Sequence, residues 1–119
     1  MDTSQAYTPE DIRDNKAMAI LSYIGILVLV PLLAAKDSPY ARFHTNQGLV
    51  LFIGEAILSI ILGIVQALAL RSLLIFTVLS VIFSLLWIPF AVWAIMGIVH
   101  AAQGQAKELP LIGHIRILN

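Results

Sequence analysis

The sequence contains no cysteine and very little charge. Its 119 residues include seven Lys and Arg and seven Asp and Glu, so that 12% are charged, against about 25% in a soluble domain. The missing cysteine excludes disulfides, thiol chemistry and cysteine-ligated metals. The balanced charge lacks the basic excess typical of nucleic-acid binding. Because so few charged side chains cannot cover a small water-soluble monomer, the composition indicates a protein whose solvent is lipid.

Catalytic and cofactor motifs are missing as well. The sequence has no nucleophile elbow, phosphate-binding loop, zinc-protease helix or dinucleotide fingerprint. Paired-carboxylate chemistry would need a second acid in the apolar runs beside Glu55, and there is none. The spacings between His44, His100 and His114 match no local metal-ligand signature. We therefore expect no enzyme activity, no cofactor and no metal site.

Three long apolar runs fill most of the chain. Residues 17–35 carry no charge, residues 49–70 carry only Glu55, and residues 72–102 have His100 as their one ionisable group. A helix of about 20 residues crosses the ~30 Å hydrocarbon core of a bilayer, and each run is long enough. The sequence thus predicts an all-α, polytopic integral membrane protein with three transmembrane helices. The polar N-terminal segment 1–16 precedes a single membrane domain, 17–119.

The run 72–102 is too long for one perpendicular span. As one helix it would extend roughly 45 Å, and Pro89 in its second half should kink or end it. The alternative is two short spans that meet near Pro89, which gives four helices. No glycine, asparagine or charge marks a turn at residues 87–90, so we favour one kinked helix and three spans.

The segments between the runs carry capping and turn signals. Thr8 and Pro9 predict a short surface helix over about residues 9–16, with a frayed terminus as the alternative. Ser38 and Pro39 suit a turn followed by a helix start, within an interfacial loop segment over 36–48. Little more than Arg71 and Ser72 separates the second run from the third, which predicts a tight helical hairpin. The tail 103–119 contains helix breakers and should lie on the membrane surface or against the helices; these breakers are Gly104, Pro110 and Gly113.

The basic residues give a slight orientation signal. With three spans, the loop 36–48 and the C-terminus share one side of the membrane. That side would carry four Lys and Arg, and the other side three. By the positive-inside rule this difference favours a cytoplasmic C-terminus.

Glu55 is the one Asp, Glu, Lys or Arg inside the three apolar runs. Its helical spacing to other polar or small residues predicts one seam, because the separations average 3.5 residues. Three interpretations of Glu55 remain open: it lines a hydrophilic path, it bonds a neighbouring helix, or it extends to the headgroups. Small residues at spacings of four also predict that the helix bearing Gly63 packs on the third run. The seam consists of His44, Gly48, Glu55, Ser59 and Gln66, and the small residues are Ser59, Gly63 and Ala67 facing Ser80 and Ser84.

Two motifs resemble those of a known family. Residues 41–48, ARFHTNQG, are similar to the RFHxNQ signature of a family of small bacterial membrane proteins. Residues 101–104, AAQG, and 109–113, LPLIG, resemble its closing motif. That family has no settled function and is grouped with the Tic-twenty component of the chloroplast inner-envelope import machinery. The positions that the resemblance marks are Arg42, Phe43, His44, Asn46, Gln47, Gly104, Pro110 and Gly113.

The resemblance implies a protein of the bacterial inner (cytoplasmic) membrane. Its expected role is that of an accessory or scaffold component that contacts other membrane proteins, in protein translocation or membrane-protein assembly. The alternative is a small oligomeric channel or carrier with a polar path lined by Glu55 and Gln66. A homo-oligomer is compatible with either role, and the marked loop and tail residues are also compatible with simply maintaining the fold.

Overall fold

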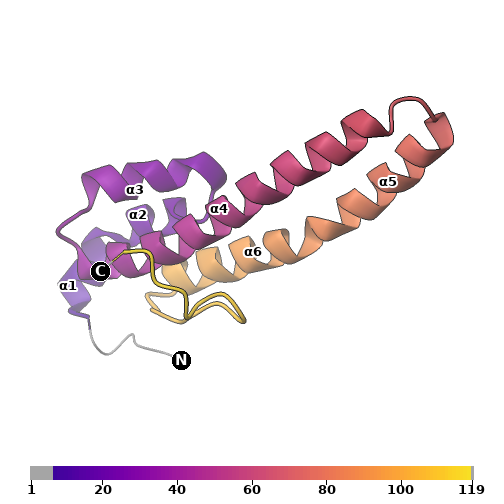
Figure 1. Ribbon diagram of the computed structural model, residues 1–119. Coiled ribbons are helices and arrows are strands. Elements are labelled where there is room, and N and C mark those ends of the chain that lie inside the picture. The colour runs from indigo at the N-terminus through magenta and orange to yellow at the C-terminus, as the bar shows by residue number, and fades with distance from the viewer. Residues whose placement is uncertain (1–6, 119) are drawn as a thin grey trace.

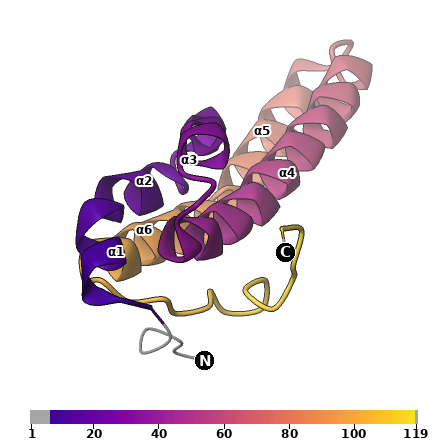
Figure 2. The ribbon, with the colours of Figure 1, turned by 90° about the vertical axis from the view of Figure 1, so that its left-hand side faces the viewer.

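The computed structural model describes residues 7–118, and every regular element in this part of the chain is a helix. Two long helical arms form a hairpin, and a group of short helices packs at its open end (Figure 1). The molecule is elongated, with dimensions of 56 × 24 × 20 Å. The C-terminal tail runs back along the same open end (Figure 2).

The chain enters through two short helices, α1 (Pro9–Asp14) and α2 (Lys16–Leu21). The Thr8 hydroxyl accepts a hydrogen bond from the Asp11 backbone N–H at 3.1 Å, and Pro9 occupies the first helical position. A proline there loses no helical hydrogen bond. The helix predicted over about 9–16 is therefore present, although it ends at Asp14.

The first apolar run does not form the continuous span that its length predicts. It is divided into α2, a 3-10 turn η2 (Gly25–Val28) and α3 (Leu29–Ala34), which fold back on one another (Figure 2). The break follows from local chemistry, because the Ser22 hydroxyl bonds the Met18 carbonyl and Gly25 has a φ of 52°. Pro31 then lacks the N–H that a continuous helix would need. The structure therefore does not confirm a third transmembrane helix.

The second run lies within α4 (Pro39–Leu68), a single helix of 30 residues. Ser38 caps it by accepting the Ala41 N–H at 3.0 Å, and Pro39 is its first residue, as the sequence predicts. The helix starts ten residues earlier than the apolar run, so most of the predicted interfacial loop is helical. At 1.5 Å per residue α4 is about 45 Å long, which leaves its first ten residues beyond the hydrocarbon core when the rest spans it.

The third run forms α5 (Leu73–Leu86) and α6 (Ile88–Ala102), which meet at Trp87 and together make one bent arm (Figure 1). Pro89 lies in the first turn of α6, where its missing N–H is tolerated. This is the single kinked helix favoured above, and it meets α4 through the predicted tight turn at 69–72. The arms 39–68 and 73–102 are the two described helices long and apolar enough to cross a membrane.

Burial is concentrated at the open end of the hairpin. The buried core combines α2, the start of α4, the end of α6 and the tail, whereas α5 has no buried residue. The distal half of the hairpin instead exposes large apolar side chains, such as Leu73 at 81% and Leu68 at 79%. Such a surface is stable in lipid. The buried residues of the core cluster are Ala19, Tyr23, Tyr40, Leu51, Ala101, Ala106 and Leu109.

Candidate functional site

The first two turns of α4 carry an unusual set of buried polar side chains. These side chains face α2, the end of α6 and the tail. Together with their partners in the turn that follows α2, they are called the polar cluster. Buried polar groups are stable only when hydrogen-bonded. The polar cluster consists of Ser22, Tyr23, Tyr40, His44, Thr45, Asn46 and Gln47.

The start of α4 is fixed by an acid from α1. One carboxylate oxygen of Asp11 accepts the Ser38 hydroxyl at 2.6 Å, and the other accepts the Tyr40 N–H at 3.0 Å. A carboxylate at a helix N-terminus satisfies free N–H groups and compensates the helix dipole. The interaction thereby attaches α1 to the long helix.

His44 lies at the centre of the polar cluster and bridges three segments. Its Nε2 is 2.9 Å from the Gln105 carbonyl, and its Nδ1 is 2.6 Å from the Tyr23 hydroxyl. A carbonyl only accepts, so Nε2 carries the proton and Nδ1 accepts from Tyr23. Burial raises the pKa of the Tyr23 hydroxyl, which keeps this donor protonated. His44 is thus a neutral bridge between Tyr23, α4 and the tail.

Two neighbours of His44 extend the same hydrogen-bond pattern. The Tyr40 hydroxyl donates to the Ala101 carbonyl at 2.9 Å, near the end of α6. The Thr45 hydroxyl lies 3.3 Å from that of Ser22, next to the break in the first apolar run. These bonds join α4 to both α6 and the segment after α2, so the open end of the hairpin is held by polar contacts as well as by apolar packing.

Two close approaches make room for these contacts. A Cβ on Gly48 would collide with the Ser22 carbonyl, and a Cβ on Gly97 would collide with the Tyr23 ring. Glycine at both positions therefore allows the turn after α2 to lie directly between the two arms of the hairpin.

Asn46 and Gln47 bind the backbone of the tail. The Asn46 amide donates to the Ile115 carbonyl at 2.8 Å and accepts the N–H groups of Ile117 and Leu118 at 2.6 and 3.0 Å. Gln47 accepts the Leu109 N–H at 3.0 Å. The tail is therefore held against α4 without forming a helix. The marked breakers lie in its bends: Gly104 follows α6 with a φ of 75°, Pro110 is exposed and Gly113 contacts Leu109.

The remaining two marked residues, Arg42 and Phe43, face the outer side of the polar cluster. The Phe43 ring contacts His44 with a centroid separation of 5.2 Å and is covered by the Arg116 guanidinium at 5.8 Å. Arg42 lies beside it at the rim of a cavity. The structure thus brings the five marked residues of the loop motif and the tail into one region.

The predicted polar seam divides inside the membrane. The Gln66 amide donates to the Ser80 hydroxyl at 2.7 Å, and Ser59 lines the same cleft of about 370 Å³ between α4 and α5. The small-residue stripes therefore face one another as predicted, but a Cβ on Gly63 would meet nothing within 4 Å, so the helices are not tightly packed there. Glu55 does not line this cleft, and its carboxyl has no hydrogen-bond partner among residues 7–118.

No group of three or more histidine, aspartate or glutamate side chains is arranged to hold a metal ion within the described part of the chain. The polar cluster offers hydrogen bonds between segments, and each of its side chains makes at least one of them, although the Gln47 amide nitrogen is buried without a partner among the described residues. Its chemistry is that of a polar joint between helices.

A family model decides what kind of protein this is. The model of the magnetosome magnetite crystal formation protein family matches residues 14–118, from the end of α1 to the end of the tail. The chain belongs to the MamF/MmsF family.

Individual members of the MamF/MmsF family are similar over most of their length. The magnetosome protein MamF of Paramagnetospirillum magneticum AMB-1 is 34% identical over 97 residues, which cover 82% of this chain and 78% of that protein. MamF of Magnetospirillum gryphiswaldense MSR-1 is 33% identical over 98 residues, with the same coverage. The magnetosome protein MmsF of the AMB-1 strain is 33% identical over 98 residues and is covered to 81%. No solved structure is significantly similar to the chain.

This membership corrects the family and the role inferred from the motifs. The matching family is that of magnetite crystal formation, and nothing links the chain to the Tic-twenty import component. The expected role in protein translocation, and with it the channel or carrier alternative, is therefore wrong. The RFHxNQ and tail motifs lie where α4 and the tail are joined, and His44, Asn46 and Gln47 make the hydrogen bonds between them.

The sequence patterns do not mark five residues that build the site: Asp11, Ser22, Tyr23, Tyr40 and Thr45. Tyr23 and Ser22 lie inside an apolar run, and Asp11 lies in the first turn of α1, where an acid is already explained by the helix dipole. The available signal was the presence of two adjacent hydroxyls at 22–23 in a run without any other polar side chain before residue 36. Adjacent hydroxyls in such a run indicate contacts with polar groups elsewhere in the protein.

Proposed function

We propose that this protein is an integral component of a magnetosome membrane and takes part in magnetite crystal formation, without an enzymatic activity of its own. The observation that carries the proposal is the extent of the family match, residues 14–118, which includes both long arms, the polar cluster and the tail. The proposed contribution is structural: a membrane-anchored hairpin displays a rigid folded end at one surface and a short turn at the other.

The arrangement in the bilayer follows from the two arms. Residues 49–68 of α4 and the facing part of α5 and α6 span the membrane, and the short helices with the tail lie at one surface. The turn η2 and the helix α3 then dip into the bilayer from that surface, because Ile26 of η2 and Leu33 of α3 are 63% and 66% exposed. The two ends of the described range, residues 7 and 118, are thus on the same side.

This two-span arrangement strengthens the orientation signal. Six of the seven basic residues lie at the open end of the hairpin, and only Arg71 lies at the tip. By the positive-inside rule, the open end with the C-terminus is cytoplasmic and Arg71 lies on the opposite side. The six residues are Arg13, Lys16, Lys36, Arg42, Lys107 and Arg116.

The function is tested by complementation in a magnetic bacterium that lacks MamF and MmsF. Electron microscopy measures the size distribution of the magnetite crystals with and without this chain. We expect expression of the chain to shift the distribution towards that of the parent strain, and His44→Ala to reduce this effect by disrupting the polar cluster. The exposed His114→Ala is the matched control. A chain that inserts and folds in the magnetosome membrane but leaves the crystals unchanged would contradict the proposal.

A further inference from the structure

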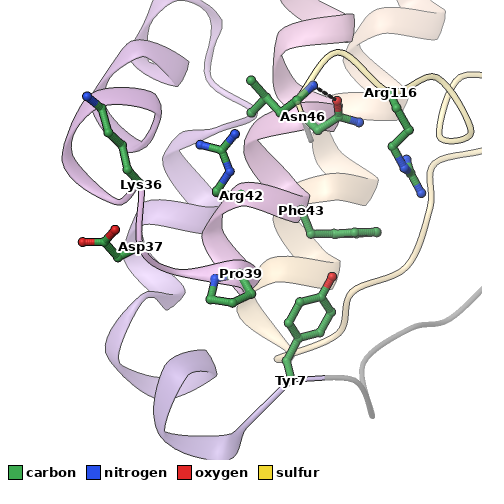
Figure 3. A pocket seen from close by; sticks show the side chains of 9 residues that line it. Tyr7, Lys36, Asp37, Pro39, Arg42, Phe43, Asn46 and Arg116 are labelled. Carbon is green, nitrogen blue, oxygen red and sulfur yellow. Dashed lines mark hydrogen bonds between the residues drawn. The ribbon is translucent and has the colours of Figure 1, made fainter.

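A cavity of about 370 Å³ opens beside the polar cluster, between the start of α4, the segment before it and the tail. Figure 3 shows the Arg42 side chain in the middle, with Lys36 and Asp37 on one side and Phe43 and Arg116 on the other. The remaining wall comes from Tyr7, Pro39, Asn46 and Leu118. The cavity is separate from the buried hydrogen bonds of His44.

The cavity lies at the height of the lipid headgroups. Its four residues from α4 are at positions 39, 42, 43 and 46, on one face of the first two turns. Those turns belong to the ten residues of α4 that extend beyond the hydrocarbon core when residues 49–68 span it. A ligand in this cavity would therefore be in contact with the membrane surface.

The charges around the cavity favour an anion. Three cationic side chains line it against one acid, Asp37. Arg116 is held by Glu108 at 2.6 Å and by the Gly113 carbonyl, so its guanidinium serves mainly as a wall over Phe43. Arg42 lies in the middle of the cavity lining and the exposed Lys36 lies at its edge, so both cationic side chains line the cavity.

The apolar surroundings favour an anion that carries hydrocarbon. Phe43, Tyr7 and Leu118 give the cavity an apolar side. The adjoining helix α3 ends at Ala34, two residues before Lys36, and exposes Val30 and Leu33 to lipid. If the phosphate of a lipid lay between the cations, the acyl chains of that lipid would lie along α3.

We propose that this cavity binds the phosphate of an anionic phospholipid, with Arg42 and Lys36 as its cationic partners and α3 as the surface for its acyl chains. Basic pockets at helix ends on the cytoplasmic side are suited to such headgroups. Arginine binds phosphate through two N–H groups and lysine as a point charge. The bound lipid would hold the segment before α4 and the tail at the same depth in the membrane.

The test is a binding titration on the full chain in neutral detergent. The probes are short-chain phosphatidylglycerol, short-chain phosphatidylcholine and inorganic phosphate, with native mass spectrometry to count the lipids retained. We expect phosphatidylglycerol to bind at least about fivefold more tightly than phosphatidylcholine, and Lys36→Gln and Arg42→Gln each to weaken it by about fivefold. Arg71→Gln, at the opposite end of the hairpin, is the matched control and should leave binding unchanged.

Four outcomes would overturn the proposal. Equal binding of the two lipids removes the preference for negative charge, and an equal loss in Arg71→Gln shows only a diffuse electrostatic attraction. Competition by inorganic phosphate at the same concentrations as the lipid assigns the site to free phosphate. Should Arg42→Gln fail to fold, the exposed Lys36→Gln decides the question, because unchanged binding in that folded variant also contradicts the assignment.

Discussion

At the scale of single residues, His44 explains why a histidine lies next to the apolar part of a membrane helix. Its two ring nitrogens have different partners, a hydroxyl and a carbonyl, and the neutral ring satisfies both. The surrounding aromatic rings of Tyr23, Tyr40 and Phe43 exclude water from it. No metal or catalytic role is needed to account for this residue.

The His44→Ala substitution should destabilise the protein by about 2–4 kcal/mol, because it leaves a cavity and removes partners from a buried hydroxyl and a buried carbonyl. Thermal or denaturant unfolding in detergent measures the change. His114→Ala is the control. That side chain is exposed, so its removal should lower the free energy of unfolding by less than about 0.5 kcal/mol. Equal free energies of unfolding for the two variants would show that the His44 bridge does not contribute to the stability of the protein.

At the scale of elements, α4 combines two environments in one helix. Its first ten residues form a polar joint with the tail and the short helices, and its remaining 20 residues present an apolar surface to lipid. The two parts also differ in how closely other segments approach the helix. Gly48 lies in the first part and has a close neighbour, whereas Gly63 lies in the second part and has none within 4 Å.

Gly48→Ala and Gly63→Ala should have opposite effects on stability. The Cβ at Gly48 collides with the Ser22 carbonyl, a backbone atom that cannot move away easily, and we expect a loss of about 1–3 kcal/mol. The Cβ at Gly63 meets open space, so alanine should gain up to about 1 kcal/mol from its higher helix propensity. Unfolding in the same detergent compares the two, and a stable Gly48→Ala variant would contradict the close approach.

The tail depends on Asn46 in the same way. Asn46→Ala removes three hydrogen bonds to the backbone of residues 115–118, and we expect trypsin to cut after Lys107 and Arg116 about tenfold faster or more. Gln103→Ala, an exposed change in the same region, is the control. An unchanged cleavage rate would mean that the tail is held by its apolar contacts alone.

At the scale of the whole molecule, the number of spans decides which surface each charge faces. Three spans divide the basic residues four to three, whereas a two-span hairpin divides them six to one. The second arrangement obeys the positive-inside rule far more strongly. In the proposed two-span arrangement, the break in the first apolar run is what places six of the seven basic residues at one end of the hairpin.

Single cysteines can report this orientation directly, because the chain has none of its own. In inner-membrane vesicles whose cytoplasmic face is outward, we expect a membrane-impermeant maleimide to label Arg13→Cys and Arg116→Cys but not Arg71→Cys. In spheroplasts the pattern should reverse. Labelling of Arg13→Cys and Arg116→Cys from opposite sides would demonstrate an odd number of spans and refute the hairpin.

The sequence alone determined the solvent of this protein and most of its local boundaries. Apolar runs as long as a bilayer is thick indicate a lipid environment. The pairs Thr8–Pro9 and Ser38–Pro39 predicted two helix starts, because capping needs only neighbouring residues. The bend near Pro89 follows from the missing N–H in the same local way.

Only the tertiary structure decided that residues 17–35 do not form one continuous helix and that the RFHxNQ residues form a joint. Tyr23 and His44 are 21 residues apart, and Asn46 and Ile115 are 69 apart. Hydrophobic length cannot report such pairs, because their energy exists only once distant segments have met. A run of apolar residues therefore bends into short helices when its few polar groups find partners outside it.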